Sequence, residues 1–314
     1  MFEFKEGLFL NKKILFAGQV LFSLLALYLL FSLINFSKIA GLVSSINLFF
    51  IPLIFLLFVL NILFFVISYW FLLGRKLPFR ETTVDYFVAW AFGLFLPGKI
   101  GELAIIPVLK KKYGVPYKFA VIATVSSKAA TFLVFCAVAL LFYFNPILLS
   151  SLILVLLGVS FGLFLFRKRS LLFLKKLSKT NHIVRDFYEN KTGLKKLFSP
   201  QNIFVLFFLA FLRFLTFAGI SYFGFLAFNF EINLVSLSIA VALSQVVAFI
   251  PISLNGIGVR ETTFAAFLAT QGVAYELSAG VAFLSLVISY LLVITIFCLW
   301  NIFLTKKLIS KGKK

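Results

Sequence analysis

Groups that perform catalysis or hold metals are scarce in this sequence. Its 314 residues include one histidine, two cysteines and ten acidic side chains. His182 lies in a basic stretch, whereas Cys136 and Cys298 lie inside apolar runs. This set offers no metal cluster, no disulfide framework and no histidine that could activate a serine or cysteine within an apolar segment. We therefore expect no enzyme activity and no cofactor.

Nucleotide-binding loops are lacking too. The two glycine-rich stretches, Pro97–Glu102 and Pro251–Glu261, do not end in the Gly-Lys-Ser/Thr sequence that binds nucleotide phosphates. ATP-driven transport by this chain alone is therefore not expected.

Apolar residues dominate what is present. Hydrophobic residues make up 62% of the chain, charged residues only 13%, and the mean hydropathy is +1.11. This apolar content exceeds that of soluble proteins. The composition predicts an all-α polytopic membrane protein, with residues 1–314 forming a single membrane domain.

The net charge of +20 could suggest a nucleic-acid partner, but the basic residues gather in short segments beside apolar runs. This is the positive-inside pattern of membrane proteins. We expect a multi-pass protein of the cell membrane with both termini in the cytoplasm and no nucleic-acid partner. Residues 1–13 carry three lysines and no small-residue cleavage site follows, so the first helix is expected to be a retained anchor.

Six apolar runs are long enough to cross a bilayer core of roughly 30 Å. They lie at residues 14–34, 46–73, 117–142, 147–166, 202–229 and 277–304. Residues 167–200, with ten Lys and Arg, are expected to form a basic cytoplasmic loop. This loop could lie as an interfacial helix on anionic lipid or simply be solvated.

Two further apolar stretches are interrupted by helix breakers, each followed by a glutamate. The breakers are Pro97, Gly98 and Gly101 in the first stretch and Pro251, Gly256 and Gly258 in the second. In the first stretch, the arms 84–96 and 102–112 would be about 20 and 16 Å long as helices, too short to cross. We expect two re-entrant helical hairpins, the second over residues 234–271.

The two hairpins have the features of an internal repeat. Each is followed by Gly-Val-x-Tyr, at Gly114–Tyr117 and at Gly272–Tyr275, and then by a long apolar helix. We place repeat 1 at about 82–142 and repeat 2 at about 234–304. Three predicted crossings separate the hairpins, so the repeats should have inverted topology and bring their tips together near the middle of the membrane.

Charged groups at membrane depth are costly and mark candidate functional sites. The candidate substrate-binding residues are Lys99, Glu102, Lys128, Arg213, Asn255, Arg260 and Glu261. Lys128 and Arg213 lie midway along predicted crossings, so we expect them to face the interior, with Glu102 or Glu261 as partners.

Structural alternatives exist for these residues. Both glutamates could stabilise the start of a helix, and the neighbouring cations Lys99 and Arg260 could simply pair with them. Asn255, like Gln245 and Ser253, could join helices by hydrogen bonds without any ligand.

The sequence Pro-Gly-Lys-Ile-Gly-Glu at 97–102, Gly-Val-Pro at 114–116 and Gly-Ile-Gly-Val-Arg-Glu at 256–261 together resemble the lysylphosphatidylglycerol synthase transmembrane region, or flippase-like, family. In its bifunctional members, the resemblance implies a membrane domain that moves an aminoacylated phospholipid to the outer leaflet. Those members carry a soluble aminoacyl-transfer domain that these 314 residues do not include, so synthase activity is not expected.

A second departure concerns the helix after the first break. The family commonly has a Glu-Arg pair and a following Asp there, and the matching positions here are Ser127, Lys128 and Thr131. The basic group is kept and the acidic groups are lost, which leaves substrate identity and coupling open.

We therefore expect a lipid flippase or transporter that moves a phospholipid or a polyprenyl-phosphate-linked lipid between leaflets. Basic residues would bind an anionic headgroup, with Glu102 and Glu261 as counter-charges or proton acceptors. One alternative is a non-catalytic membrane partner of a lipid- or glycan-modifying enzyme. An integral transferase is the least favoured, because nucleotide and metal motifs are missing.

Overall fold

The computed structural model describes residues 28, 44–75, 77–93, 103–142, 199–250 and 253–311, and every regular element within these ranges is helical. The eight described α-helices are α3 (Ile51–Leu72), α4 (Phe79–Gly93), α5 (Ile105–Tyr113), α6 (Tyr117–Phe142), α10 (Pro200–Ala227), α11 (Leu234–Ala248), α12 (Val259–Thr270) and α13 (Tyr275–Lys311). The 3₁₀ turns Leu48–Phe50 and Leu254–Gly256 accompany them. The all-α prediction is confirmed.

Four of the described helices are long and apolar enough to cross a membrane. They cover Leu48–Leu72, Tyr117–Leu140, Pro200–Ala227 and Tyr275–Ile296. Four of the six predicted crossings are therefore helices of the expected length and character. The other two, at 14–34 and 147–166, and the basic loop lie outside the described residues except at single positions, so the total of six stays a prediction.

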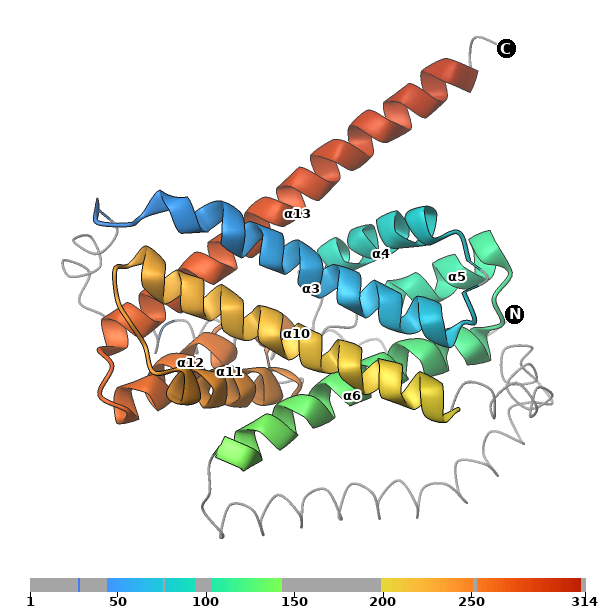
Figure 1. Cartoon of the computed structure of the whole chain (residues 1–314). Coiled ribbons are helices and arrows are strands. Elements are labelled where there is room, and N and C mark those ends of the chain that lie inside the picture. The colour runs from blue at the N-terminus through green and yellow to red at the C-terminus, as the bar shows by residue number, and fades with distance from the viewer. Residues whose placement is uncertain are drawn as a thin grey trace, which may run out of the picture.

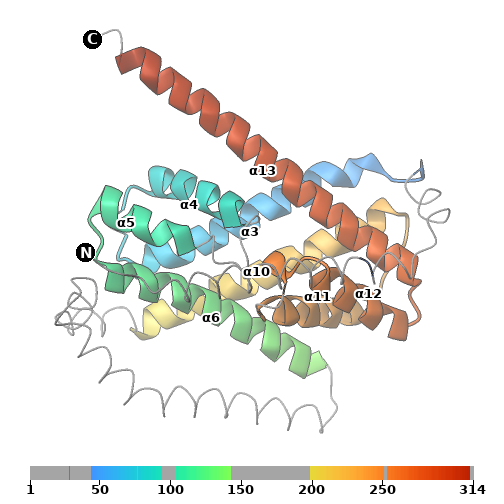
Figure 2. The ribbon, with the colours of Figure 1, turned by 180° about the vertical axis from the view of Figure 1, so that it is seen from behind.

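Helices α3 and α10 pack side by side and antiparallel in the centre of the molecule (Figure 1). The start of α3 lies beside the end of α10, where the Asn47 N–H donates to the Ala227 carbonyl at 2.8 Å. Asn229, just after α10, donates to the Ser45 carbonyl at 2.9 Å. Figure 2, which shows the opposite side of the molecule, has α13 crossing in front of this pair, and Ile288 of α13 completes an apolar cluster with their residues.

Helices α4 and α5 form the first hairpin. Lys112 near the end of α5 binds Asp85 of α4 at 2.8 Å, and Tyr113 donates to the same carboxylate at 2.6 Å. Desolvation lowers the pKa of Lys112, but its hydrogen bonds to Asp85 and Tyr113 offset this, so the pKa lies above its usual value. The open end of the hairpin lies where α3 ends, because only a short connection separates Leu72, the last residue of α3, from Phe79, the first residue of α4.

The arms of this hairpin differ from their predicted limits. Helix α4 starts at Phe79 instead of 84. The hydroxyls of Thr82 and Thr83 donate to the carbonyls of Pro78 and Phe79 and so extend the first turn. Helix α5 starts at Ile105 instead of 102, after a short 3₁₀ turn. The intervening tip, residues 94–102, lies outside the described residues.

Helices α11 and α12 form the second hairpin. Their 15 and 12 residues give lengths of about 22 and 18 Å, so neither would cross a bilayer core of roughly 30 Å. The Ser236 hydroxyl donates to the Gln271 side chain at 3.4 Å and joins the open end of the hairpin. The predicted break within 234–271 separates two helices, whereas a re-entrant course in the membrane stays a prediction.

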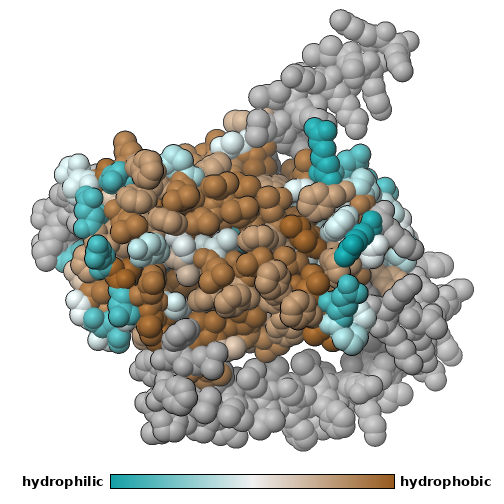
Figure 3. Space-filling view, in the orientation of Figure 1, coloured by the Kyte–Doolittle hydropathy of each residue, from teal (hydrophilic) through white to brown (hydrophobic). Residues whose placement is uncertain are grey.

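The two hairpins open at opposite ends of the α3–α10 pair. The first opens where α3 ends, and the second follows the end of α10, which lies beside the start of α3. Figure 3 shows that an apolar belt separates two polar ends along this axis. The inverted topology itself stays a prediction. The repeat boundaries 82–142 and 234–304 stay predictions.

Candidate functional site

The second break is a tightly packed turn with three residues in the left-handed region. Asn255, Gly256 and Gly258 have φ values of 50°, 81° and 82°. A Cβ on Gly256 would lie 2.7 Å from the Cβ of Ala248, near the end of α11. Glycine is therefore required at position 256 both by the backbone conformation and by the close approach of α11.

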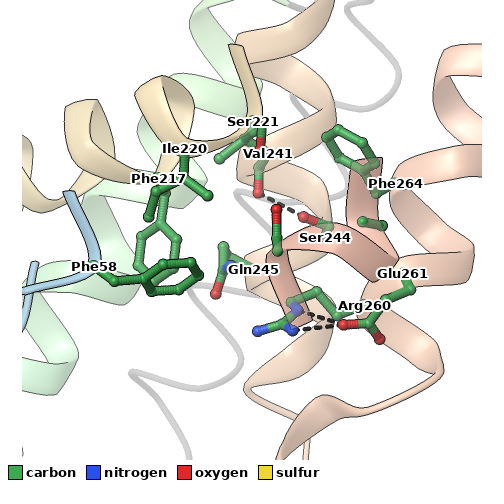
Figure 4. Close-up of a pocket in the computed structure, with 12 residues that line it drawn as sticks. Phe58, Phe217, Ile220, Ser221, Val241, Ser244, Gln245, Arg260, Glu261 and Phe264 are labelled. Carbon is green, nitrogen blue, oxygen red and sulfur yellow. Dashed lines mark hydrogen bonds and ion pairs between the residues drawn. The ribbon is translucent and has the colours of Figure 1, made fainter. Parts of the chain in front are cut away.

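Glu261 divides its two carboxylate oxygens between the backbone and a neighbouring cation. Oε2 accepts the Gly258 N–H at 2.8 Å at the start of α12, and Oε1 accepts from Nε and Nη2 of Arg260, with Nε at 2.9 Å (Figure 4). The side chain is only 3% exposed. Both structural alternatives raised for Glu261, a helix cap and an ion pair with its neighbour, therefore occur together.

Arg213 projects from the middle of α10 into a polar cluster between helices. Its Nη1 donates to Thr131 Oγ1 of α6 at 2.8 Å, and its Nη2 donates to Asn61 Oδ1 of α3 at 3.4 Å. The guanidinium carbon lies 4.8 Å from the centroid of the Phe65 ring. Hydrogen bonds and a cation–π contact thus compensate for the burial of this charge.

Two neighbouring cavities lie among α3, α10, α11, α12 and α13. Both are lined by Phe58, Phe217, Gln245 and Arg260 (Figure 4 shows the first cavity). The first has a volume of about 50 Å³ and includes Glu261. The second has a volume of about 70 Å³. Each offers room for several water molecules.

We call the second cavity the two-arginine cavity, because Arg213 and Arg260 both line it. Asn61 of α3 and Asn255 of the second break contribute amides to its walls. Trp90, close to the end of α4, lines it as well. The structure therefore brings the second break and the last described turn before the first break to one cavity.

A model of the lysylphosphatidylglycerol synthase TM region matches residues 16–297. The chain belongs to this family. The matched range includes both hairpins and both cavities. Comparison with curated proteins and with solved structures finds no match.

In this member of the lysylphosphatidylglycerol synthase TM region family, four of the predicted site residues gather around the two cavities. They are Arg213, Asn255, Arg260 and Glu261. Lys128 is half-buried on α6 and lines neither cavity. The remaining predicted residues, Lys99, Glu102, Pro97, Gly98, Gly101 and Pro251, lie outside the described residues.

Within the described residues, sequence reasoning missed Asn61, Trp90 and Tyr290 of the two-arginine cavity. Asn61 had a usable signal, because it is a lone amide within the apolar run of α3 and is 5% exposed. Trp90 and Tyr290 had no such signal, because the chain contains forty-five phenylalanines and aromatic residues occur in all of its apolar runs.

The two-arginine cavity favours an anion. Arg213 and Arg260 supply two guanidinium groups, and among the described residues Glu261 pairs with Arg260 and offsets one of the two positive charges. Guanidinium groups bind phosphate through paired N–H donors, and amides such as Asn61 and Gln245 add neutral hydrogen bonds. Within the described ranges, no group of three or more His, Cys, Asp or Glu side chains is placed to hold a metal ion.

Proposed function

We propose that this chain moves a lipid with an anionic headgroup between the two leaflets of the cell membrane and binds the headgroup phosphate in the two-arginine cavity. The observation that carries the proposal is that Arg213 of α10 and Arg260 of α12 line one cavity together with Asn255 of the second break and Trp90 of the last described turn before the first break. Membership of a family named for a phospholipid synthase supports a lipid as the ligand.

The cavity suits the polar part of a lipid rather than a whole molecule. Its volume is far smaller than a lipid, so the acyl or polyprenyl chains would remain in the bilayer while the phosphate enters. The aromatic walls, including Phe58 and Phe217, lower the local polarity and would strengthen the electrostatic attraction between arginine and phosphate.

Access from both leaflets follows from the arrangement of the hairpins. Because they open at opposite ends of the α3–α10 pair, a movement of one hairpin would admit the headgroup from one side and a movement of the other would release it on the other side. Glu261 would hold α12 and Arg260 in place during the cycle, while Arg260 would turn its remaining N–H donors to the phosphate.

The test is lipid movement in vesicles that contain the purified chain and a leaflet-specific fluorescent phosphatidylglycerol. Arg213→Ala and Arg260→Ala should each slow movement about tenfold or more, because each removes charge-assisted hydrogen bonds to the phosphate. Arg80→Ala is the matched control, because Arg80 is exposed on the first turn of α4 and lines neither cavity.

Equal rates for the wild type and both cavity variants would overturn the proposal, provided that the wild type moves lipid. If the wild type moves no lipid and instead co-purifies with a lipid- or glycan-modifying enzyme, the role of a non-catalytic membrane partner replaces it.

A further inference from the structure

A third and larger cavity lies at the end of the molecule where α3 ends. Its volume is about 830 Å³, and it shares no lining residue with the two central cavities. Its walls come from residues 71–75 and Leu77 at the end of α3, 113–119 around the turn between α5 and α6, and 199–202 at the start of α10. This volume is within the range of cavities that bind small molecules and cofactors.

The lining combines apolar and polar side chains, which could contact the acyl chain and the headgroup of a lipid, respectively. Phe71, Leu73, Val115 and Phe119 supply apolar walls, whereas Ser199, Gln201 and Asn202 from the first turn of α10 supply polar groups. Arg75 is the single charged side chain among the described lining residues.

Arg75 occupies a conformation that is unfavourable for its residue type. Its φ is 58°, directly after Gly74 at 76°, and its N–H closes the end of α3 by bonding to the Trp70 carbonyl at 3.1 Å. Glycine or asparagine would fit this left-handed position at lower cost. Because the backbone conformation does not favour arginine at this position, we infer that the Arg75 side chain has a role of its own.

Among the described residues, the guanidinium of Arg75 contacts an aromatic ring and donates no hydrogen bond. Its central carbon lies 4.3 Å from the centroid of the Phe71 ring. Contact with a ring face is a cation–π interaction, so the planar N–H donors stay available for a phosphate.

The surrounding charge also favours an anion. Arg80 and Lys110–Lys112 lie at the same end as Arg75, and the acidic residues of α4, Glu81 and Asp85, both bind Lys112, at 3.5 and 2.8 Å. The positive charge of Arg75 therefore remains in excess beside the apolar belt. Basic pockets between membrane helices at this level bind anionic lipid headgroups.

We propose that this cavity binds an anionic phospholipid, with the phosphate at Arg75 and part of an acyl chain along Phe71, Val115 and Phe119. The apolar walls favour a lipid over a water-soluble anion. The site is separate from the central cavities, so the inference does not depend on lipid transport.

The experiment is native mass spectrometry of the 314-residue chain, purified in detergent and incubated with phosphatidylglycerol or phosphatidylcholine. The wild type should retain phosphatidylglycerol preferentially. Arg75→Ala should lower its retention about fivefold, the effect of one basic residue at a membrane surface. Arg80→Ala, the same change of charge at an exposed position outside the cavity, should leave retention unchanged.

The melting curve of Arg75→Ala shows whether this variant folds. If it does not, two further variants test the proposal. Arg75→Lys should keep most of the retention. Gln201→Trp, at an exposed position on the cavity wall, should lower retention without changing charge.

Three results would overturn the proposal. Equal losses for the Arg75 and Arg80 variants would indicate a general surface charge. Equal retention of both lipids by the wild type would exclude an anionic site. Displacement of phosphatidylglycerol by soluble glycerol phosphate would indicate a site for a free anion rather than for a lipid.

Discussion

Asn61 of α3 and Arg213 of α10 are joined by two hydrogen bonds of opposite direction. The Asn61 amide donates to the Arg213 carbonyl at 3.1 Å, and Nη2 of Arg213 donates to Asn61 Oδ1 at 3.4 Å. The same amide nitrogen lies 2.6 Å from Thr216 Oγ1. One side chain of α3 thus fixes both the backbone and the guanidinium of the arginine that we place at the lipid phosphate.

Replacing Asn61 by Leu should lower the free energy of unfolding by about 1–3 kcal/mol, because it leaves buried polar groups of α10 without this partner. It should also slow lipid movement. Ser68→Ala is the control, since Ser68 is buried in the same helix and, within the described residues, donates to the Phe65 carbonyl of its own turn and to no other helix. Denaturant titrations in detergent, followed by circular dichroism, give the free energy of unfolding of both variants, and the vesicle assay gives the rate of lipid movement. Equal effects of the two variants would contradict the cross-helix role.

Gly256→Ala should destabilise the protein more than Gly272→Ala. Both glycines have a φ of 81°, so the conformational cost of alanine, about 1–2 kcal/mol, is shared. Only Gly256 has a neighbour in the way, Ala248, at 2.7 Å from the added Cβ; Gly272 has open space. Melting temperatures of the purified variants measure the difference.

The double variant Ala248→Gly with Gly256→Ala should regain part of the lost stability, because it removes the atom that clashes. Absence of any rescue would show that the cost at Gly256 comes from its backbone conformation alone.

Glu261→Ala should lower the free energy of unfolding by about 2–4 kcal/mol, because the variant loses a helix cap and leaves Arg260 without its carboxylate. Glu261→Gln should lose less, since its amide oxygen can still accept the Gly258 N–H. Glu231, an exposed acidic residue, serves as control through Glu231→Gln. Thermal unfolding should rank the variants in this order, and a Glu261→Ala variant as stable as the wild type would refute the assignment.

Asp85→Asn should loosen the open end of the first hairpin more than Glu81→Gln. Asp85 is 8% exposed and accepts from both Lys112 and Tyr113, whereas the Glu81 side chain is 60% exposed and lies 3.5 Å from the same lysine. Exposed ion pairs contribute little. Hydrogen exchange of peptides from α4 and α5 should rise in the Asp85 variant and stay near the wild-type level in the Glu81 variant.

Long apolar runs predicted the helices well, because the thickness and the apolar character of the bilayer core set the length and hydropathy of a spanning helix. Helix α6 was predicted at 117–142 and is found at those residues, and α10 starts two residues before its predicted start. That shift has a local cause. Ser199 caps the helix by accepting the Asn202 N–H, and Pro200 fits its first turn.

The candidate site was predicted in part. Charges in apolar runs identified Arg213 and Arg260, since each needs compensation at membrane depth. Their local partners were harder to foresee. Arg213 meets Thr131 and Asn61 across helices that are far apart in sequence, and only the packing of α3, α6 and α10 determines such contacts.

The close approach of Gly256 to Ala248 has a mechanical consequence for the second hairpin. Because Gly256 lies against Ala248 at the end of α11, we expect α11 and α12 to move as one piece. Its two attachments to the rest of the chain each contain a residue of positive φ, Asn229 after α10 and Gly272 after α12. We therefore expect these two short connections to act as hinges for a joint movement of α11 and α12.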